Sequence, residues 1–373
     1  MRKLLRLFIR PVRRALEKIS RGRFRARLEQ IPFTLAQGGP ALNYGAVLPR
    51  QKGAIVQGGK VKLLHLTRAF PEQANHFNLL YLISSAIPPH GVELARWAKK
   101  RGARLVWNQN GVGFPAWAGA DYEEINRPMR ELLQMADFVF YQSAFCRQSA
   151  TRFLGEAPCG SSLVFNPVDT EVFVPSQSPP PPLPLQLLAA GTHHQPYRVT
   201  SAIECLWFLR EKMGVDARLT LAGALRWSGA DAQIKAMISR LGLEEVIIRR
   251  PAYTQREAVA IFQEAHLLLH PKFNDPCPTV VLEAMACGLP VIGSQSGGMP
   301  ELVGEEGGRL LAPPEQTWDT LHPPDPRQMA EAAMALMQSW PERSRAARER
   351  AERLFKKELW IEHHRTVFEQ LAG

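Results

Sequence analysis

The chain has 373 residues and a net charge of +11, and hydrophobic residues make up 45% of it. This composition excludes wholesale disorder, and the length allows two domains with cores of ordinary size. We expect no membrane span and no secretory signal, because no apolar run is long enough and arginines interrupt the N-terminus. The five cysteines are odd in number and lack C-x-x-C spacing, which argues against a disulfide framework or a zinc site and favours a reducing compartment.

The positive charge is concentrated in residues 1–30, which contain eleven Lys or Arg residues but only two acids, Glu17 and Glu29. Apolar residues recur there at helical spacing between the basic ones, and Pro11 predicts a break. We interpret this segment as a basic amphipathic anchor on an anionic membrane surface. A solvated tail and a nucleic-acid-binding arm are alternatives, but the arginines alternate with Leu, Phe and Ile rather than with polar residues. The sequence thus favours a cytoplasmic protein bound peripherally to a membrane, with no nucleic-acid partner.

From residue 52 onward, runs of strand length alternate with helical patterns. In the first half we predict strands at Ala54–Val56, Asn78–Ser84, Ala103–Trp107 and Asp137–Tyr141, and helices at Lys60–Phe70, Val92–Arg101 and Glu123–Met135. This alternation is typical of a parallel sheet with helices on both faces.

A proline-rich segment at residues 175–184 interrupts the alternation, since such a segment favours extended polyproline geometry. The pattern then restarts. We predict strands at Leu185–Ala190, Ala217–Ala222, Val246–Arg249, His266–His270 and Pro290–Gly293, and helices at Thr200–Met213, Ala232–Leu241, Arg256–Glu264, Val280–Ala286 and within 325–373.

Two alternating halves joined by prolines indicate an α/β chain with two doubly wound, Rossmann-like domains. We place the first domain at residues 31–177, the linker at 178–184 and the second domain at 185–340. The remaining helices occupy residues 341–373.

The most informative segment runs from His270 to Val303 and contains two acids, Asp275 and Glu283, eight positions apart. Its loop follows a strand and leads into a helix, which is where open α/β sheets bind ligands and where helix N-termini favour phosphate. If Thr279 begins the helix, the two acids can flank one ligand with a central phosphate and hydroxyl groups at both ends, such as a nucleotide sugar.

The alternative is that Asp275 merely caps the helix and that Glu283 lies on the surface. We favour the functional interpretation, because Glu283 lies in the apolar run Val-Val-Leu-Glu-Ala-Met-Ala and an unpaired buried acid would be costly.

This segment resembles glycosyltransferase family 4, the retaining family with the GT-B architecture. The resemblance lies in two acids separated by seven residues, then Ala-Met-Ala-Cys-Gly-Leu-Pro-Val and a Gly-Gly-Met-Pro-Glu turn. Asp275 stands where the family usually has glutamate, and Pro278 where it usually has glycine. Residues 136–145 and 166–173 look like two further signatures that close the first domain. The resemblance implies two Rossmann-like domains that face each other across a cleft, with the helices after Pro341 crossing back to the first domain.

The resemblance also assigns residues to the donor site. Gly191 closes the strand that opens the second domain, and Arg198 is the nearest candidate for the basic pair that grips the donor diphosphate. Gly58-Gly59 resembles the glycine turn at which a ligand approaches the backbone. Asn110 falls where the family often has a histidine near the reacting sugar. Asparagine can hydrogen-bond a sugar hydroxyl but cannot act as a general base.

The implied reaction moves a hexosyl group, with retention, from a nucleoside diphosphate sugar to a hydroxyl of a glycan or glycolipid. Asp275 and Asn110 would act at the transferred sugar and Glu283 on the ribose. Arg198, the amides of Thr279 and Val280 and the helix dipole would stabilise the leaving diphosphate. The sequence has no Asp-x-Asp motif and no metal-ligand spacing, so we expect neither a metal nor a cofactor.

Two other classes remain open. An oxidoreductase or a sugar-nucleotide epimerase uses the same kind of sheet, but no G-x-G-x-x-G follows a predicted first strand. A non-catalytic nucleotide-sugar-binding protein is the other alternative. Its marks would be the departures from the family pattern at Asp275, at Pro278 and at Thr192, which follows Gly191 where the family has the basic pair.

Overall fold

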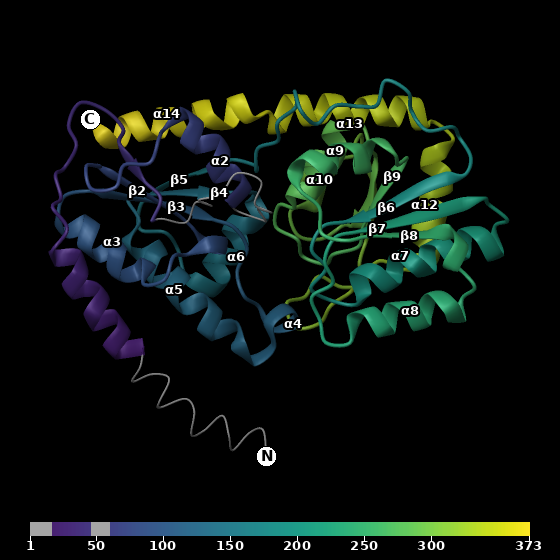
Figure 1. Cartoon of the computed structure of the whole chain (residues 1–373), viewed down its shortest axis with the longest axis horizontal. Coiled ribbons are helices and arrows are strands. Elements are labelled where there is room, and N and C mark those ends of the chain that lie inside the picture. Colours follow the sequence, from purple (N-terminus) through teal and green to yellow (C-terminus); the bar gives the residue numbers. More distant parts are fainter. Residues whose placement is uncertain (1–16, 46–59) are drawn as a thin grey trace, which may run out of the picture.

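The computed structural model describes residues 17–45 and 60–373 as two α/β domains side by side, with a pair of C-terminal helices running along both (Figure 1). The predicted strand Ala54–Val56 and the Gly58-Gly59 turn lie outside the described residues, as do residues 1–16. No helix in the described ranges is long and apolar enough to cross a membrane.

The described part of the first domain has five parallel strands in the order β1-β2-β3-β4-β5. These strands are β1 (Leu42–Asn43), β2 (Leu79–Ile83), β3 (Arg104–Gln109), β4 (Phe138–Tyr141) and β5 (Gly160–Leu163). The helices are α2 (Lys60–Ala69), α3 (Gly91–Lys100), α4 (Pro115–Ala118), α5 (Tyr122–Met135) and α6 (Ala144–Leu154).

Alternating side chains of these strands build a core on each face of the sheet. In β2, Leu80 and Leu82 pack with residues of α3, α5 and α6, whereas Leu79, Tyr81 and Ile83 pack with α2 and α14 (Lys357–Ala372). This period of two is what a sheet covered on both faces requires. All five residues of β2 are buried.

The second domain has six parallel strands in the order β11-β10-β9-β6-β7-β8. They are β6 (Leu185–Ala190), β7 (Ala217–Ala222), β8 (Ile247–Arg250), β9 (Leu267–His270), β10 (Val291–Ser294) and β11 (Gly308–Leu311). The helices are α7 (Tyr197–Trp207), α8 (Ala230–Arg240), α9 (Gln255–Gln263), α10 (Thr279–Ala286), α11 (Met299–Val303) and α12 (Pro326–Met337).

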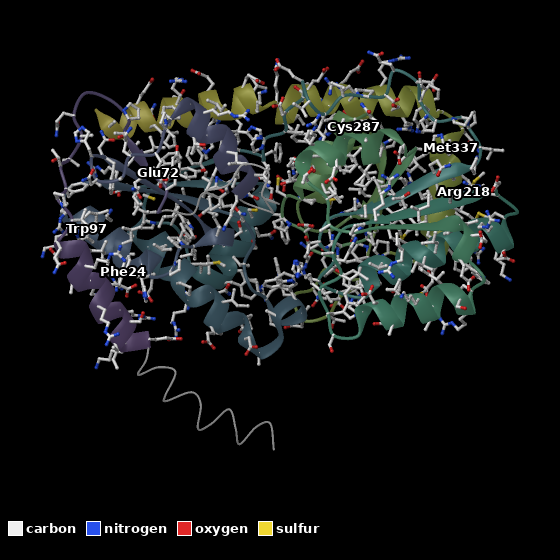
Figure 2. The ribbon with its side chains drawn as sticks, in the orientation of Figure 1. Phe24, Glu72, Trp97, Arg218, Cys287 and Met337 are labelled. Atoms are coloured by element: carbon white, nitrogen blue, oxygen red, sulfur yellow. The ribbon has the colours of Figure 1, made fainter. Side chains whose placement is uncertain are left out.

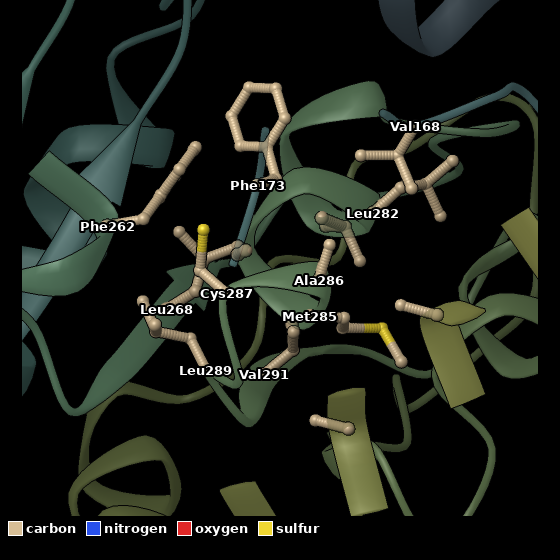
Figure 3. Close-up of a cluster of buried hydrophobic side chains, with 14 of the residues drawn as sticks. Val168, Phe173, Phe262, Leu268, Leu282, Met285, Ala286, Cys287, Leu289 and Val291 are labelled. Atoms are coloured by element: carbon tan, nitrogen blue, oxygen red, sulfur yellow. The ribbon is translucent and has the colours of Figure 1, made fainter. Parts of the chain in front are cut away.

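The helix that carries Glu283 is embedded in one of this domain's two cores. Leu282, Met285 and Ala286 of α10 pack among Leu268 of β9, Val291 of β10 and residues of α9 (Figure 3). The chain that leaves the first domain contributes to the same core through Val168 and Phe173 (Figure 3). Burial on this scale fixes α10 relative to the sheet, so the residues at its N-terminus are held by the core.

The C-terminal helices divide between the domains, which corrects the expectation that everything after Pro341 crosses back. α13 (Trp340–Phe355) contains Pro341 in its first turn and packs on α10 of the second domain through Ala347 and Ala351. The chain crosses at Lys356, and α14 packs on α2 and β2 of the first domain. The crossing predicted from the family resemblance is therefore made by α14 (Figure 1).

Residues 17–29 form a helix that lies against the first domain (Figure 1). Leu28 is buried in the core that contains α3, and Phe24 packs on His90, with Phe24 labelled on this helix in Figure 2. Ile19 is 54% exposed, so this part of the predicted apolar face has no covering in the described structure.

The predicted elements mostly differ from the structure by one or two residues at their ends. The strands at 185–190 and 217–222 match the prediction residue for residue. The helix predicted at Thr200–Met213 begins three residues earlier, at Tyr197, and its end is a π-helical turn at Phe208–Lys212. The elements β1, β5, β11, α4, α6 and α11 were not predicted, because short or half-exposed elements carry little periodicity.

Candidate functional site

Two adjoining cavities lie between the domains, where the carboxyl ends of both sheets meet. The first, the carboxylate cavity, measures about 430 Å³, and Gly191, Arg198, Asp275 and Glu283 are among its lining residues. The second, the aromatic cavity, measures about 350 Å³ and contains Asn110 in its lining. Five residues line both cavities, so the two form one continuous site: Ser85, Lys272, Asp275, Pro278 and Thr279.

Asp275 lies in the loop after β9, is 6% exposed and carries a fixed negative charge. Its Oδ2 lies 3.0 Å from Nε2 of His270 and 3.1 Å from Nζ of Lys272. Burial favours the neutral acid, but Lys272, His270 and Arg198 outweigh it and hold the pKa of Asp275 well below its usual range. Burial lowers the pKa of His270, so the neutral imidazole donates this hydrogen bond.

Asp275 does not cap α10, which excludes the structural alternative for this residue. The N-cap position of α10 is Pro278, and no side chain caps it.

Glu283 lies in the second turn of α10, is 4% exposed and is therefore not the surface residue of the alternative interpretation. Burial raises the pKa of Glu283 to about 7, against a hydrogen bond with Gln255 that lowers it. The charged form is thus poorly compensated in the protein alone. A ligand that donates hydrogen bonds to this carboxylate would supply the missing partners.

Arg198 lies in the first turn of α7 and is buried. One guanidinium nitrogen donates to the carbonyl of Thr192 over 2.6 Å. Thr192 follows Gly191, which has a φ of 105° and leaves the end of β6 open toward the cavity. Burial lowers the pKa of Arg198, and the charge of Asp275 opposes this shift.

The N-terminus of α10 faces the same cavity. Thr279 and Val280 are half-buried and line it, and as the first two residues of the helix their N–H groups have no carbonyl one turn earlier to bind. These donors and the helix dipole favour an anion at this position.

The Gly-Gly turn after β10 supports the Asp275 loop from behind. The N–H of Gly298 donates to the carbonyl of Asp275 over 2.9 Å. A Cβ on Gly298 would lie 2.0 Å from the carbonyl oxygen of Pro276, and one on Gly297 would lie 2.5 Å from that of Asp275. Glycine is needed here because the two loops touch through their backbones.

The first-domain wall is built from amides around a buried lysine. Nζ of Lys62 donates to Oδ1 of Asn108 at 2.5 Å and of Asn110 at 2.9 Å, and Gln142 also donates to Oδ1 of Asn110. Burial lowers the pKa of Lys62 to about 7. The side-chain nitrogen of Asn110 donates to Ser85. Asn110 therefore lines the aromatic cavity with its side chain already engaged, and it does not line the carboxylate cavity.

The two walls are tied together by contacts between the domains. Glu301 of α11 accepts from the N–H groups of Ala144 and Phe145 at the start of α6, over 2.7 and 3.0 Å. Ser143 donates to the carbonyl of Pro276, and Trp318 stacks on Phe145 with ring centroids 5.2 Å apart. The described structure thus has the two domains in contact around the site.

Several residues of the site were missed at the sequence level. Lys272, Lys62 and Asn274 belong to it, and only Lys272 had a local signal, since it is a cation three residues before Asp275. Lys62 sits in an ordinary helical pattern, and its place beside Asn110 depends on the fold. The predicted Gly58 and Gly59 cannot be placed because they lie outside the described residues. Within residues 17–45 and 60–373, no three His, Cys, Asp or Glu side chains gather as a metal site would require.

Comparison with known proteins gives a family match that falls in the second domain. Residues 181–353 match the family of glycosyl transferases group 1. This match covers the second domain and most of α13 and includes Asp275, Glu283 and Arg198.

Curated relatives match over shorter stretches. A D-inositol 3-phosphate glycosyltransferase of Arthrobacter sp. (strain FB24) is 30% identical over 145 residues, which cover 36% of this chain and 34% of that protein. The protein of the same name from Streptomyces bingchenggensis (strain BCW-1) is 36% identical over 81 residues, or 22% of this chain and 18% of that protein. The chain therefore spans about a third or less of the length of these relatives. The family's description and the names of both relatives refer to glycosyl transfer.

Solved structures extend the likeness to both domains. The structure of Anabaena HepE in complex with UDP-glucose matches with a TM-score of 0.68 and 14% sequence identity. The match covers 90% of this chain and 98% of the HepE chain. The sucrose-phosphate synthase of Thermosynechococcus elongatus has a TM-score of 0.62 and 18% identity over 84% of this chain and 76% of that one. At these identities the likeness shows the fold, and the fold is GT-B.

Proposed function

We propose that the protein transfers a glycosyl group, with retention and without a metal, from a nucleoside diphosphate sugar to a hydroxyl acceptor. The observation that carries the proposal is the carboxylate cavity, which Arg198, Asp275 and Glu283 line together with the N-terminus of α10. The Anabaena neighbour is described in complex with UDP-glucose, which supports a donor of this class for the proposal.

The cavity offers a separate partner for each part of such a donor. The carboxylate of Glu283 would accept hydrogen bonds from the ribose hydroxyls, because burial leaves its charge in need of donors. Arg198 and the amides of Thr279 and Val280 would hold the diphosphate, whose charge increases as its bond to the sugar breaks. Asp275 lines both cavities and would face the transferred sugar.

In the described lining, the two residues proposed to act at the transferred sugar offer no free base toward the acceptor. Asp275 is ionised but ion-paired, and Asn110 is an amide engaged on both side-chain atoms. In the proposal, the departing diphosphate therefore accepts the acceptor's proton. The acceptor attacks the same face of the sugar from which the diphosphate leaves. Transfer on that face retains the anomeric configuration.

The test is turnover of a panel of nucleoside diphosphate sugars, with release of the nucleoside diphosphate measured in the presence of EDTA. We expect turnover of at least one donor, and an axial product linkage by NMR when the donor linkage is axial. Binding of nucleoside diphosphates without turnover of any donor would instead indicate a non-catalytic binding protein. An inverted product would contradict the assigned stereochemistry.

We further propose that the N-terminal segment holds the enzyme on the cytoplasmic face of an anionic membrane, in the synthesis of an envelope polysaccharide or glycolipid. In the described helix at residues 17–29, the exposed side chains include Lys18, Arg23 and Arg27. Each basic residue near such a surface contributes about 1 kcal/mol, screened by salt.

A liposome sedimentation assay tests this anchor at low salt. Changing Lys18, Arg23 and Arg27 to Glu should release the full-length protein from vesicles that contain phosphatidylserine. The same change at Arg218, Lys235 and Arg240, which are exposed on the second domain, should not. Equal sedimentation of the two variants would refute the anchor.

A further inference from the structure

The aromatic cavity contains two tryptophans, one from each domain. Trp117 of α4 is 41% exposed although it lines a concave site, and Trp318 reaches the same cavity from the second-domain loop between β11 and α12. Trp318 packs on Phe114 and Phe145, with centroids 5.3 and 5.2 Å away. Large apolar rings that stay exposed inside a pocket are a surface for a ligand with an apolar face.

A second observation also indicates a ligand in this cavity. Asn274 lines it, is 4% exposed, and has a side-chain oxygen that finds no hydrogen-bond partner in the described structure. Its side-chain nitrogen donates to the carbonyl of Thr317 over 3.1 Å, which fixes the orientation of the amide. The unpaired oxygen is thus a buried acceptor that a hydroxyl group would satisfy.

Among the described residues that line the cavity, positive and negative charge are balanced. Lys272 and Asp275 are the charged residues in the described lining, and they pair with each other at 3.1 Å. The other polar side chains are amides and hydroxyls, among them Asn110, Gln142 and Ser149. A phosphorylated ligand would need an unpaired cation here, because phosphate carries up to about two negative charges near neutral pH.

We propose that the aromatic cavity binds the acceptor of the proposed glycosyl transfer, and that this acceptor is an uncharged pyranose ring of a glycan. The C–H groups on one face of the ring pack against Trp117 and Trp318, and a ring hydroxyl donates to the buried oxygen of Asn274. Because the cavity shares Asp275 and Thr279 with the carboxylate cavity, a second hydroxyl of the same ring lies next to the donor sugar. The inference rests on the proposed function and adds the acceptor class, which differs from the inositol phosphate in the names of the curated relatives.

Saturation-transfer NMR on the full-length protein tests the acceptor class without requiring turnover. The probes are cellobiose, maltose and D-inositol 3-phosphate, each added to the protein with and without UDP. We expect saturation to pass from the protein to at least one neutral disaccharide. The dissociation constant of that disaccharide should be at least tenfold lower than that of D-inositol 3-phosphate.

Three variants define the site. Trp117→Ala should weaken binding of the disaccharide at least tenfold, and Trp117→Phe should restore part of it because a phenyl ring keeps an apolar face. Leu359→Ala, which removes an apolar side chain that is 54% exposed on α14, is the control and should change nothing. UDP affinity, measured by calorimetry, should stay within twofold in all three.

The outcomes separate this inference from the proposed function. Failure of UDP to bind the wild-type protein would count against the proposed donor site, whatever the saccharides do. Binding of D-inositol 3-phosphate in preference to both disaccharides would overturn the neutral acceptor. The inference would also be overturned if neither disaccharide bound, or if Trp117→Ala left the affinity unchanged.

Discussion

The second-domain wall of the site carries four Arg, Lys, Asp or Glu side chains, whereas the described part of the first-domain wall presents amides. Arg198, Lys272, Asp275 and Glu283 all come from the second domain and line the carboxylate cavity. On the facing wall, Asn110 and Gln142 each follow directly on a strand of the first sheet, and the side-chain oxygen of Asn110 accepts from both Gln142 and Lys62.

The difference follows from what each wall is proposed to bind. A diphosphate brings charge that increases during transfer, so the donor wall needs fixed cations, amide donors and a helix N-terminus. A neutral acceptor brings hydroxyl groups, and a charged wall facing it would pay for desolvation without a counter-charge. Lys62 fits this division, because burial lowers its pKa to about 7 and its Nζ is turned toward amide oxygens.

The contrast between the two walls predicts its largest effect on turnover at Asp275. Asp275→Asn should lower turnover about 100-fold, because a lost hydrogen bond to a charged partner is worth roughly 1.5–3 kcal/mol. UDP affinity should stay within twofold, since the side chain faces the sugar rather than the nucleotide. Steady-state rates alongside calorimetry with UDP separate the two quantities.

Asp275→Glu is the matched control, because it keeps the charge and supplies the residue that the family usually has at this position. It should retain much more turnover than Asp275→Asn. If Asp275→Asn abolishes UDP binding, the assignment of this residue to the sugar is wrong.

A smaller effect is expected at Glu283 and depends on pH. Burial raises the pKa of Glu283 to about 7 in the free protein, and ribose hydroxyls prefer the carboxylate. UDP binding should therefore weaken about tenfold from about pH 8 to about pH 6, as the carboxylate takes up its proton. Glu283→Gln should bind UDP about tenfold more weakly at the higher pH and should lose this dependence.

Titration of the nucleotide's own phosphate affects both proteins equally and cancels in the ratio of their dissociation constants. If the ratio of the two dissociation constants does not change with pH, the assignment of Glu283 to the ribose hydroxyls is wrong.

The smallest effect on the donor is expected from the first-domain wall. Lys62→Met should leave UDP affinity within twofold but should change the pH dependence of stability. Above about pH 7, folded Lys62 has lost a proton that the unfolded chain keeps up to about pH 10.5, so folding releases a proton. The unfolding free energy of the wild type should then increase with pH relative to Lys62→Met, by about 1.4 kcal/mol per pH unit.

Urea unfolding of both proteins at several pH values between about 7.5 and 9.5 measures this slope. A constant difference in unfolding free energy would mean that Lys62 keeps its proton, and that the first-domain wall is charged like the second.

The same contrast shows how much of the molecule the sequence could predict. Strands such as 185–190 are buried on both faces, so their apolar runs predicted them residue for residue. The donor wall could also be predicted from the sequence, because Asp275, Thr279 and Glu283 lie within nine residues of one strand–loop–helix unit. Local spacing there already determines which residues share a cavity.

The first-domain wall could not be predicted in the same way. Lys62 meets Asn110 and Asn166 across large sequence separations, and these contacts exist only once the sheet has formed. Asn274 has a φ of 52°, and nothing local shows that its oxygen is left unpaired. The role of the C-terminal helices was predicted in part, since apolar residues required a partner surface but did not show that α13 would pack on the second domain and only α14 on the first.

A crystal structure of the protein with UDP tests the division between the two walls most directly. The division predicts the ribose hydroxyls within hydrogen-bonding distance of Glu283. It also predicts the diphosphate between Arg198 and the N–H groups of Thr279 and Val280, with the aromatic cavity left free of nucleotide. UDP bound in the aromatic cavity, or with its diphosphate directed toward Asn110 and away from Arg198, would contradict it.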